Sequence, residues 1–106
     1  MILCTTDEIP GKKIVATYGL VRGNAIRARH VGKDIMAGLQ TLVGGEIHEY
    51  TKLMGEVREQ SLDRMSSEAK RMGANAVVGL RMSTSMIMNN AAEMVAYGTA
   101  VKVEEA

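Results

Sequence analysis

The chain has 106 residues, the length of one domain, and 46% of them are hydrophobic, which is enough for a single core. Its 13 basic and 12 acidic residues leave a formal net charge of +1, so no strong electrostatic field favours nucleic acid or an anionic membrane as a partner. The single cysteine excludes an internal disulfide, and no apolar run approaches the ~20 residues that span a bilayer.

The N-terminal residues lack the basic start and long apolar run of a signal peptide, so we expect one cytoplasmic domain over residues 1–106. After a turn at Pro10-Gly11, a strand is predicted from Lys12 to Arg22, and Gly23-Asn24 is expected to break it. Apolar residues occupy both alternating faces of this strand. Because a strand with one solvated face alternates apolar and polar residues, we expect this one to be covered on both sides.

Two helices are expected next. The first runs from Lys33 to Val43 and ends at Gly44-Gly45. The second runs from Glu46 to Met72, and Gly73 ends it just before an apolar strand. Its apolar or small residues recur every three or four positions, at Ile47, Tyr50, Met54, Val57, Ser61, Met65, Ala69 and Met72.

Two strands complete the chain. In the first, alternation places Val78, Leu80, Met82, Met86 and Met88 on one face, and Asn89-Asn90 predicts the turn that follows. The second, Glu93 to Val103, has bulky apolar residues on one side and small residues on the other. Small residues allow another backbone to approach closely, so this strand is the expected subunit contact. The residues assigned to that contact are Val21, Tyr97, Gly98 and Ala100.

The order of strands, two helices and strands predicts an α+β fold of two layers, with an antiparallel sheet covered by helices on one face. Two strands without a solvent-facing side are unusual in so short a chain. They predict a homo-oligomer, closed and cyclic because open sheet edges would otherwise propagate.

Six features occur in order along nearly the whole chain: Val21–Ile26, Lys33–Gly38, Val43–Gly45, Tyr50, Gly73–Gly79 and Gly98–Val101. Together they resemble the YbjQ-like family of small bacterial and archaeal proteins, which carry a heavy-metal-binding label and no established function. The resemblance implies a dodecin-like subunit in a ring-shaped homopentamer, and it implies no established catalysis. Many relatives have acidic residues where this chain has Leu80-Arg81-Met82-Ser83, so the metal label does not map onto an obvious set of ligands.

The candidate metal ligands are one thiol and two imidazoles, those of Cys4, His30 and His48. Sulfur donors favour a soft or transition metal ion such as Cu(I). The chain has no Cys-x-x-Cys or His-x-x-x-His spacing, so a site would have to pool residues from several subunits. The alternative interpretation makes Cys4 a structural, mostly buried thiol and places the thioethers of Met82, Met86 and Met88 in the core.

A basic segment supplies the candidate ligand-binding residues Arg22, Arg27, Arg29 and Lys33, which could cradle an anion at the start of the following helix. It lacks the ending of a phosphate loop, because Asp34 follows Lys33, and a solvated basic loop is the simpler alternative. A catalytic thiol would need a histidine base within hydrogen-bond reach, which only the fold could bring there. The sequence has no signature of a cysteine enzyme, so we expect no enzymatic activity.

These patterns favour a ring-forming protein that binds a heavy-metal ion or small ligand between its subunits. The alternative is a structural or regulatory homo-oligomer that recruits a protein partner and binds no metal.

Overall fold

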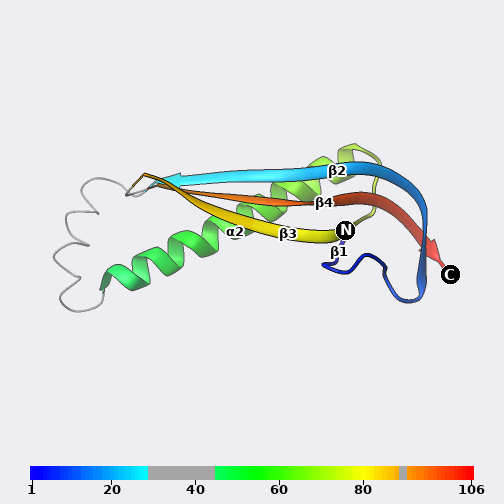
Figure 1. Ribbon diagram of the computed structural model, residues 1–106, viewed down its shortest axis with the longest axis horizontal. Helices are drawn as coiled ribbons and strands as arrows, with labels where there is room; N and C mark the ends of the chain where they lie inside the picture. Colours follow the sequence, from blue (N-terminus) through cyan, green and yellow to red (C-terminus); the bar gives the residue numbers. More distant parts are fainter. Residues whose placement is uncertain (29–44, 89–90) are drawn as a thin grey trace.

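A computed structural model of the chain describes residues 1–28, 45–88 and 91–106. The described elements are β1 (Ile2–Leu3), β2 (Lys12–Ala28), α2 (Gly45–Arg71), β3 (Ala76–Met88) and β4 (Ala91–Glu105). The strands form one sheet in the order β1-β3-β4-β2, and α2 lies against one face of it (Figure 1). The predicted α+β class and the two layers are therefore confirmed. The helix predicted over residues 33–43 and the turn predicted at residues 89–90 lie outside the described residues.

The sheet is mixed, so the prediction of an antiparallel sheet is wrong at one edge. β4 pairs antiparallel with both β2 and β3, whereas β1 pairs parallel with β3. Beyond β1, the N–H of Cys4 donates to the carbonyl of Val77 at 2.9 Å, and the N–H of Leu80 donates to the carbonyl of Cys4 at 3.0 Å. A two-residue strand is too short to show an alternating pattern, which is why the sequence does not reveal this pairing.

β2 extends to Ala28, so the prediction that Gly23-Asn24 breaks the strand is wrong. Gly23 does not form a turn; it allows the backbone of α2 to pack closely against the strand. A Cβ atom at this position would lie 2.2 Å from the backbone oxygen of Ser61 and 2.3 Å from the backbone nitrogen of Met65. The backbone of α2 therefore rests directly on β2 at this glycine.

Helix α2 matches the predicted helix to within one residue at each end. Gly73 ends it with a φ of +99°, and the N–H groups of Gly73 and Ala74 donate to the carbonyls of Lys70 and Ala69, each at 3.0 Å. This pair of hydrogen bonds is the Schellman motif, which satisfies carbonyls that the helix itself leaves without partners. The predicted helix end at Gly73 is confirmed.

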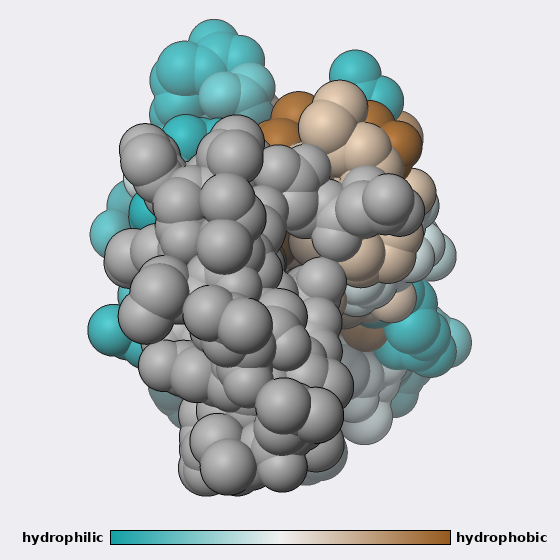
Figure 2. Space-filling model, turned by 90° about the vertical axis from the view of Figure 1, so that its left-hand side faces the viewer, coloured by the Kyte–Doolittle hydropathy of each residue, from teal (hydrophilic) through white to brown (hydrophobic). Residues whose placement is uncertain are grey.

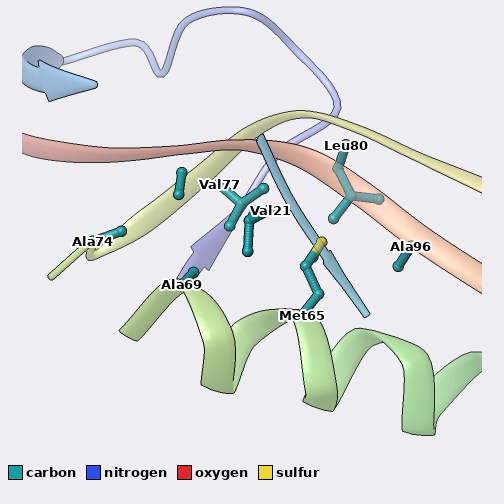
Figure 3. Close-up of a cluster of buried hydrophobic side chains, with 8 residues drawn as sticks. Val21, Met65, Ala69, Ala74, Val77, Leu80 and Ala96 are labelled. Carbon is teal, nitrogen blue, oxygen red and sulfur yellow. The ribbon is translucent and has the colours of Figure 1, made fainter. Parts of the chain in front are cut away.

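The core lies between α2 and the sheet. Met65 is completely buried and projects from α2 toward the strands (Figure 3). Most of its neighbours are small, which lets the two layers approach closely. The buried cluster consists of Val21, Met65, Ala69, Ala74, Val77, Leu80, Ala96 and Ala100.

A second buried cluster lies on the face of the sheet that α2 does not cover, which we call the far face. The pairing of β3 with β4 shifts between Val78 and Arg81, where Gly79 has a φ of +62°. Because of this shift, Val78 packs in the far-face cluster while Leu80 packs under α2. The predicted common face of Val78 and Leu80 is therefore wrong, since an irregularity in the pairing reverses the alternation.

Candidate functional site

Cys4 is the one candidate metal ligand whose surroundings the structure describes. It is half-buried beside β3, to which its backbone groups are hydrogen-bonded. His30 lies outside the described residues, and His48 lies at the start of α2 in a stretch whose side chains are not described. Within residues 1–28, 45–88 and 91–106, no three His, Cys, Asp or Glu side chains gather into a group that could hold a metal ion.

The three methionines of β3 do not share one environment. Met82 is half-buried and packs against the cluster under α2, in agreement with the core interpretation. Met86 and Met88 are 57% and 60% exposed, so that interpretation is wrong for them. Helix α2 does not cover these two residues, since its N-terminal end lies well away from the tips of the strands (Figure 1). Figure 2 views this end of the molecule and shows apolar surface exposed beside hydrophilic surface.

The predicted basic site is divided between the two faces of β2. Arg27 donates to Oε1 of Gln60 at 3.1 Å and lies 4.0 Å from a carboxylate oxygen of Glu56, so it faces α2. Arg22 is exposed on the far face, because residues of opposite parity in a strand point to opposite sides. These two arginines therefore do not converge on one small anion. Arg29 and Lys33 lie outside the described residues.

The predicted subunit contact maps mostly to the interior of a single chain. Val21, Gly98 and Ala100 are buried beneath the chain's own helix, so the small-residue face of β4 is not available to a second subunit. A Cβ at Gly98 would lie 2.7 Å from Cγ1 of Val77, which shows that the close approach expected here is made within the chain. Tyr97, the fourth predicted residue, lies on the far face and is 39% exposed.

The far face is covered at one end and open at the other. Ile2 and Ile9 of the N-terminal segment pack against the far-face cluster that contains Val101 and Val103. Toward the strand tips, the pairing register places Tyr97 between Arg22 of β2 and Arg81 of β3. Leu20 and Ile26 of β2 are 68% and 57% exposed.

Sequence reasoning missed the outer edge of β2. This strand ends the sheet, and over its 17 residues no described strand pairs with its outer side. The guanidinium of Arg64 donates to the carbonyl oxygen of Asn24 at 2.7 Å, so this carbonyl faces the open edge. The signal in the sequence was the run of apolar residues on both faces of β2, which predicts covered faces and does not show where a sheet ends. In the single chain, Leu20 and Ile26 on the far face are exposed, so the predicted cover is missing there.

A pocket of about 630 Å³ follows this edge, between β2 and α2. Its walls combine apolar side chains with charged ones. The lining residues are Leu20, Val21, Arg22, Gly23, Asn24, Arg64, Glu68 and Met72.

Beside the pocket, Glu68 and Arg71 form an ion pair on α2. The hydrogen bond from Arg71 lowers the pKa of the Glu68 carboxyl below its usual range, and the same bond raises the pKa of Arg71. Both groups are exposed, so solvent and salt screen their interaction.

None of the described helices is long and apolar enough to cross a membrane.

Comparison with known proteins identifies the family. The family model described as "Putative heavy-metal-binding" matches residues 1–104. A UPF0145 protein of Dehalococcoides mccartyi is 56% identical over 104 residues, which are 98% of this chain and 100% of the relative. A UPF0145 protein of Methanosarcina acetivorans is 55% identical over 103 residues, 97% of each chain.

A crystal structure of a DUF74-family protein of unknown function from Pediococcus pentosaceus has the same fold, with a TM-score of 0.62 at 16% identity and 98% of each chain covered. The match of the family model over nearly the whole chain confirms the resemblance that the six sequence features indicated. The chain belongs to the YbjQ-like family of UPF0145 proteins.

Proposed function

We propose that the protein is a non-enzymatic homo-oligomer that holds a heavy-metal ion between its subunits. One observation carries this proposal. The family is described as metal-binding, yet the described part of one chain contains no group of three or more His, Cys, Asp or Glu residues. Ligands pooled from several copies would reconcile these two facts, because a structural zinc site takes four ligands and a single copy offers one thiol.

The surface of the single chain supports association. Leu20 and Ile26 are exposed on β2, an edge strand of 17 residues. Exposed apolar residues on a long edge strand favour contact with another chain, and proteins normally avoid this by shortening, charging or covering the edge. A chain of 106 residues also hides only a modest share of its surface when it folds alone, so contact between subunits adds stability. The resemblance to the family favours a ring of five.

Cys4 is the ligand that we assign to the metal. Its thiol is half-buried rather than enclosed, so it can reach a contact between copies. Thiolate sulfur prefers soft ions such as Cu(I), and Zn²⁺ also accepts it. A ring would bring one Cys4 from each subunit to an equivalent position, which gives repeated donors without any Cys-x-x-Cys spacing.

Elemental analysis combined with native mass spectrometry tests the proposal on protein purified without an affinity tag. We expect an oligomer that carries a fixed number of metal ions per ring and loses them on Cys4→Ser. The control variant Thr5→Ser changes the neighbouring exposed residue, keeps the thiol and should keep the metal. An oligomer that takes up no metal when it is loaded with Cu(I) or Zn²⁺ would contradict the metal site.

The second candidate is a structural or regulatory homo-oligomer that recruits a protein partner. The exposed row of Arg22, Tyr97 and Arg81 on the far face favours it, since arginine and tyrosine are enriched at protein contacts. This candidate predicts metal-free oligomers whose partner binding is lost on Tyr97→Ala and unaffected by Cys4→Ser.

A further inference from the structure

Methionine side chains gather under the N-terminal half of α2, in a part of the molecule that the proposed function does not use. Met94 of β4 is 5% exposed and forms a buried cluster with Ala25 and Val57. Met54 of α2 and Met82 of β3 are half-buried and pack against the same cluster. The helix and two strands therefore each direct one thioether into a single cluster.

The pairing of β3 with β4 explains how the strands bring these side chains together. Met94 lies directly opposite Thr84, and Met82 and Met86 lie two positions from Thr84 on either side. Residues diagonal to each other across two strands are about 7–8 Å apart, within reach of long side chains. Met86 precedes the register shift, so it keeps the face of Met82. Met88 follows the shift and does not share that face.

The sulfur of Met94 is held by a hydrogen bond. The hydroxyl of Thr84 donates to Sδ of Met94 at 3.1 Å. A thioether sulfur has two lone pairs, so the other one stays open to a further partner. Hydrogen bonds of this kind orient ligand atoms in metal sites. Methionine has three rotatable side-chain bonds, so Met54 and Met82 can adjust their sulfurs to an ion beside Met94.

The chemistry of these donors defines the ion that they fit. Thioether sulfur is a soft ligand, which favours Cu(I) over hard ions such as Mg²⁺ and Ca²⁺. The donors are neutral, so they do not offset the charge of an ion, and a buried divalent ion would cost more free energy than a monovalent one. We propose that Met54, Met82 and Met94 of one chain form a binding site for a single soft monovalent ion, Cu(I) or Ag(I).

This site goes beyond the proposed function, because it lies within one copy and does not use Cys4. Met86, the next residue of β3 on the same face, is 57% exposed, so the site lies close to solvent in the single chain. The N-terminal end of α2 diverges from the strand tips at this end of the molecule (Figure 1). Neutral thioethers bind an ion less tightly than a thiolate does. We therefore expect the ion to be lost during purification, and the test loads the protein again.

The competing interpretation is that these methionines only fill the core. The chain has nine methionines and no Phe or Trp, so methionine is its main large filler. Met65 and Met72 have that role in the cluster under the C-terminal half of α2. Leucine has nearly the same volume as methionine and no sulfur. Substitution of methionine by leucine therefore keeps the packing and removes the ligand.

Titration with Ag(I) tests the site, because this ion is soft, monovalent and stable without a reductant. The protein is the Cys4→Ser variant in chloride-free buffer at pH 5. Histidines are mostly protonated at this pH and do not bind metal, whereas a thioether has no proton to lose. Native mass spectrometry counts the ions per chain, and calorimetry measures the Kd. We expect one Ag(I) per chain at pH 5.

Two substitutions in the same background separate binding from packing. Met94→Leu and Met82→Leu should each weaken Ag(I) binding by tenfold or more. Met72→Leu and Met88→Leu are matched controls that should bind like the parent, because Met72 lies at the opposite end of α2 and Met88 lies beyond the register shift. Circular dichroism melting shows that each variant folds. In protein labelled at the methionine methyl groups, Ag(I) should shift the NMR signals of Met54, Met82 and Met94.

The possible outcomes distinguish this site from the proposed one at Cys4. Ag(I) binding that Met94→Leu and Met82→Leu leave unchanged would overturn the methionine site. Absence of Ag(I) uptake by the Cys4→Ser variant at pH 5 would also overturn it, and metal bound only by chains that retain Cys4 would leave the proposed function intact. One ion per chain in the Cys4→Ser variant, without any ion shared between wild-type copies, would support the methionine site and contradict the site at Cys4.

Discussion

At the scale of single residues, glycines and alanines set how closely the helix and the strands pack against one another. Gly23 allows the backbone of α2 to lie against β2, and Gly98 allows Val77 to approach β4. Neither residue needs the conformational freedom of glycine, since the positive φ values among the described residues occur elsewhere. The missing Cβ is therefore what matters at both positions.

Gly23→Ala should destabilise the protein by about 2–3 kcal/mol or more, because the added methyl group would meet backbone atoms of Ser61 and Met65, which cannot rotate away. Urea unfolding at a fixed protein concentration measures the change. Gly55→Ala is the matched control: nothing lies within 4 Å of a Cβ there, and alanine is preferred in a helix by about 1 kcal/mol. We expect that variant to be more stable than the wild type. Equal stability of Gly23→Ala and wild type would contradict the direct contact of α2 with β2.

At the scale of elements, α2 was predictable and the strands were only partly so. A helix of 27 residues shows several repeats of its apolar period, and Gly73 marks its end unambiguously. β3 has an irregular pairing near Gly79, which shifts the phase of the residues from Arg81 to Met86, and a second shift follows between Met86 and Met88. The alternation of a sequence does not show where such an irregularity occurs, because both phases remain apolar around Val78 and Leu80.

The C-terminal turns of α2 carry a charge interaction that depends on pH. Arg71 lowers the pKa of Glu68, so the ionised carboxylate is favoured in the folded state. A lowered pKa stabilises the fold above the pKa of the unfolded chain, about 4.3, and this stabilisation is lost as the pH falls through the lower folded value. Glu68→Gln removes the titrating group, so its stability should fall below that of wild type at pH 7 and approach it at pH 3.

Thermal melting of both proteins from pH 7 to pH 3 measures this difference. Because Glu68 and Arg71 are exposed, the difference should be small and should decrease in high salt. Lys12→Gln serves as the control, since it removes a cross-strand ion pair to Glu105 and leaves the helix pair unchanged. A gap between Glu68→Gln and wild type that widens toward acid pH would contradict the assignment.

At the scale of the whole molecule, the middle of the helix-facing side of the sheet is buried within the single chain, whereas the strand edges and tips are exposed. The helix side is closed by Met65 and its small neighbours. The edges of β2 and β3 and the strand tips keep exposed apolar residues such as Leu20 and Met86. An assembly of several copies would cover these exposed surfaces. Substitution of the exposed Met86 should therefore affect association, and substitution of the buried Met65 should affect the stability of the subunit.

Met86→Ser should weaken association and leave the fold of the subunit intact. Burying a methionine contributes about 1.5–3 kcal/mol, so its loss at a contact raises the concentration of half-dissociation by roughly tenfold or more per contact. Met65→Ala should instead lower the stability of the subunit by about 2–5 kcal/mol, because Met65 is fully buried. Size-exclusion chromatography with light scattering over a dilution series separates the two effects. An unchanged dissociation profile for Met86→Ser would exclude this side chain from the contact.

The candidate site was less predictable than the fold. Cys4 could be named from its residue type alone, and its half-buried place beside β3 follows from hydrogen bonds to Val77 and Leu80, far away in the sequence. Arg22 and Arg27 looked like one basic segment, but the extension of β2 through both residues directs them to opposite faces. Gly98 and Ala100 were correctly identified as a close-packing face, but the structure places them, together with Val21, beneath the chain's own helix instead of at a subunit contact.

The sequence by itself determined the α+β class, the helix that ends at Gly73, the apolar character of β2 and β4, and the family, because periodicity, capping and motif order are local properties of a chain. Only the tertiary structure decided which layer covers each face, where the irregularity at Gly79 reverses β3, that β1 lies parallel to it, and which strand edges remain open. These features depend on contacts between residues far apart in sequence. Burial of an apolar side chain is favourable, and the geometry of the folded chain decides whether it is covered and by what.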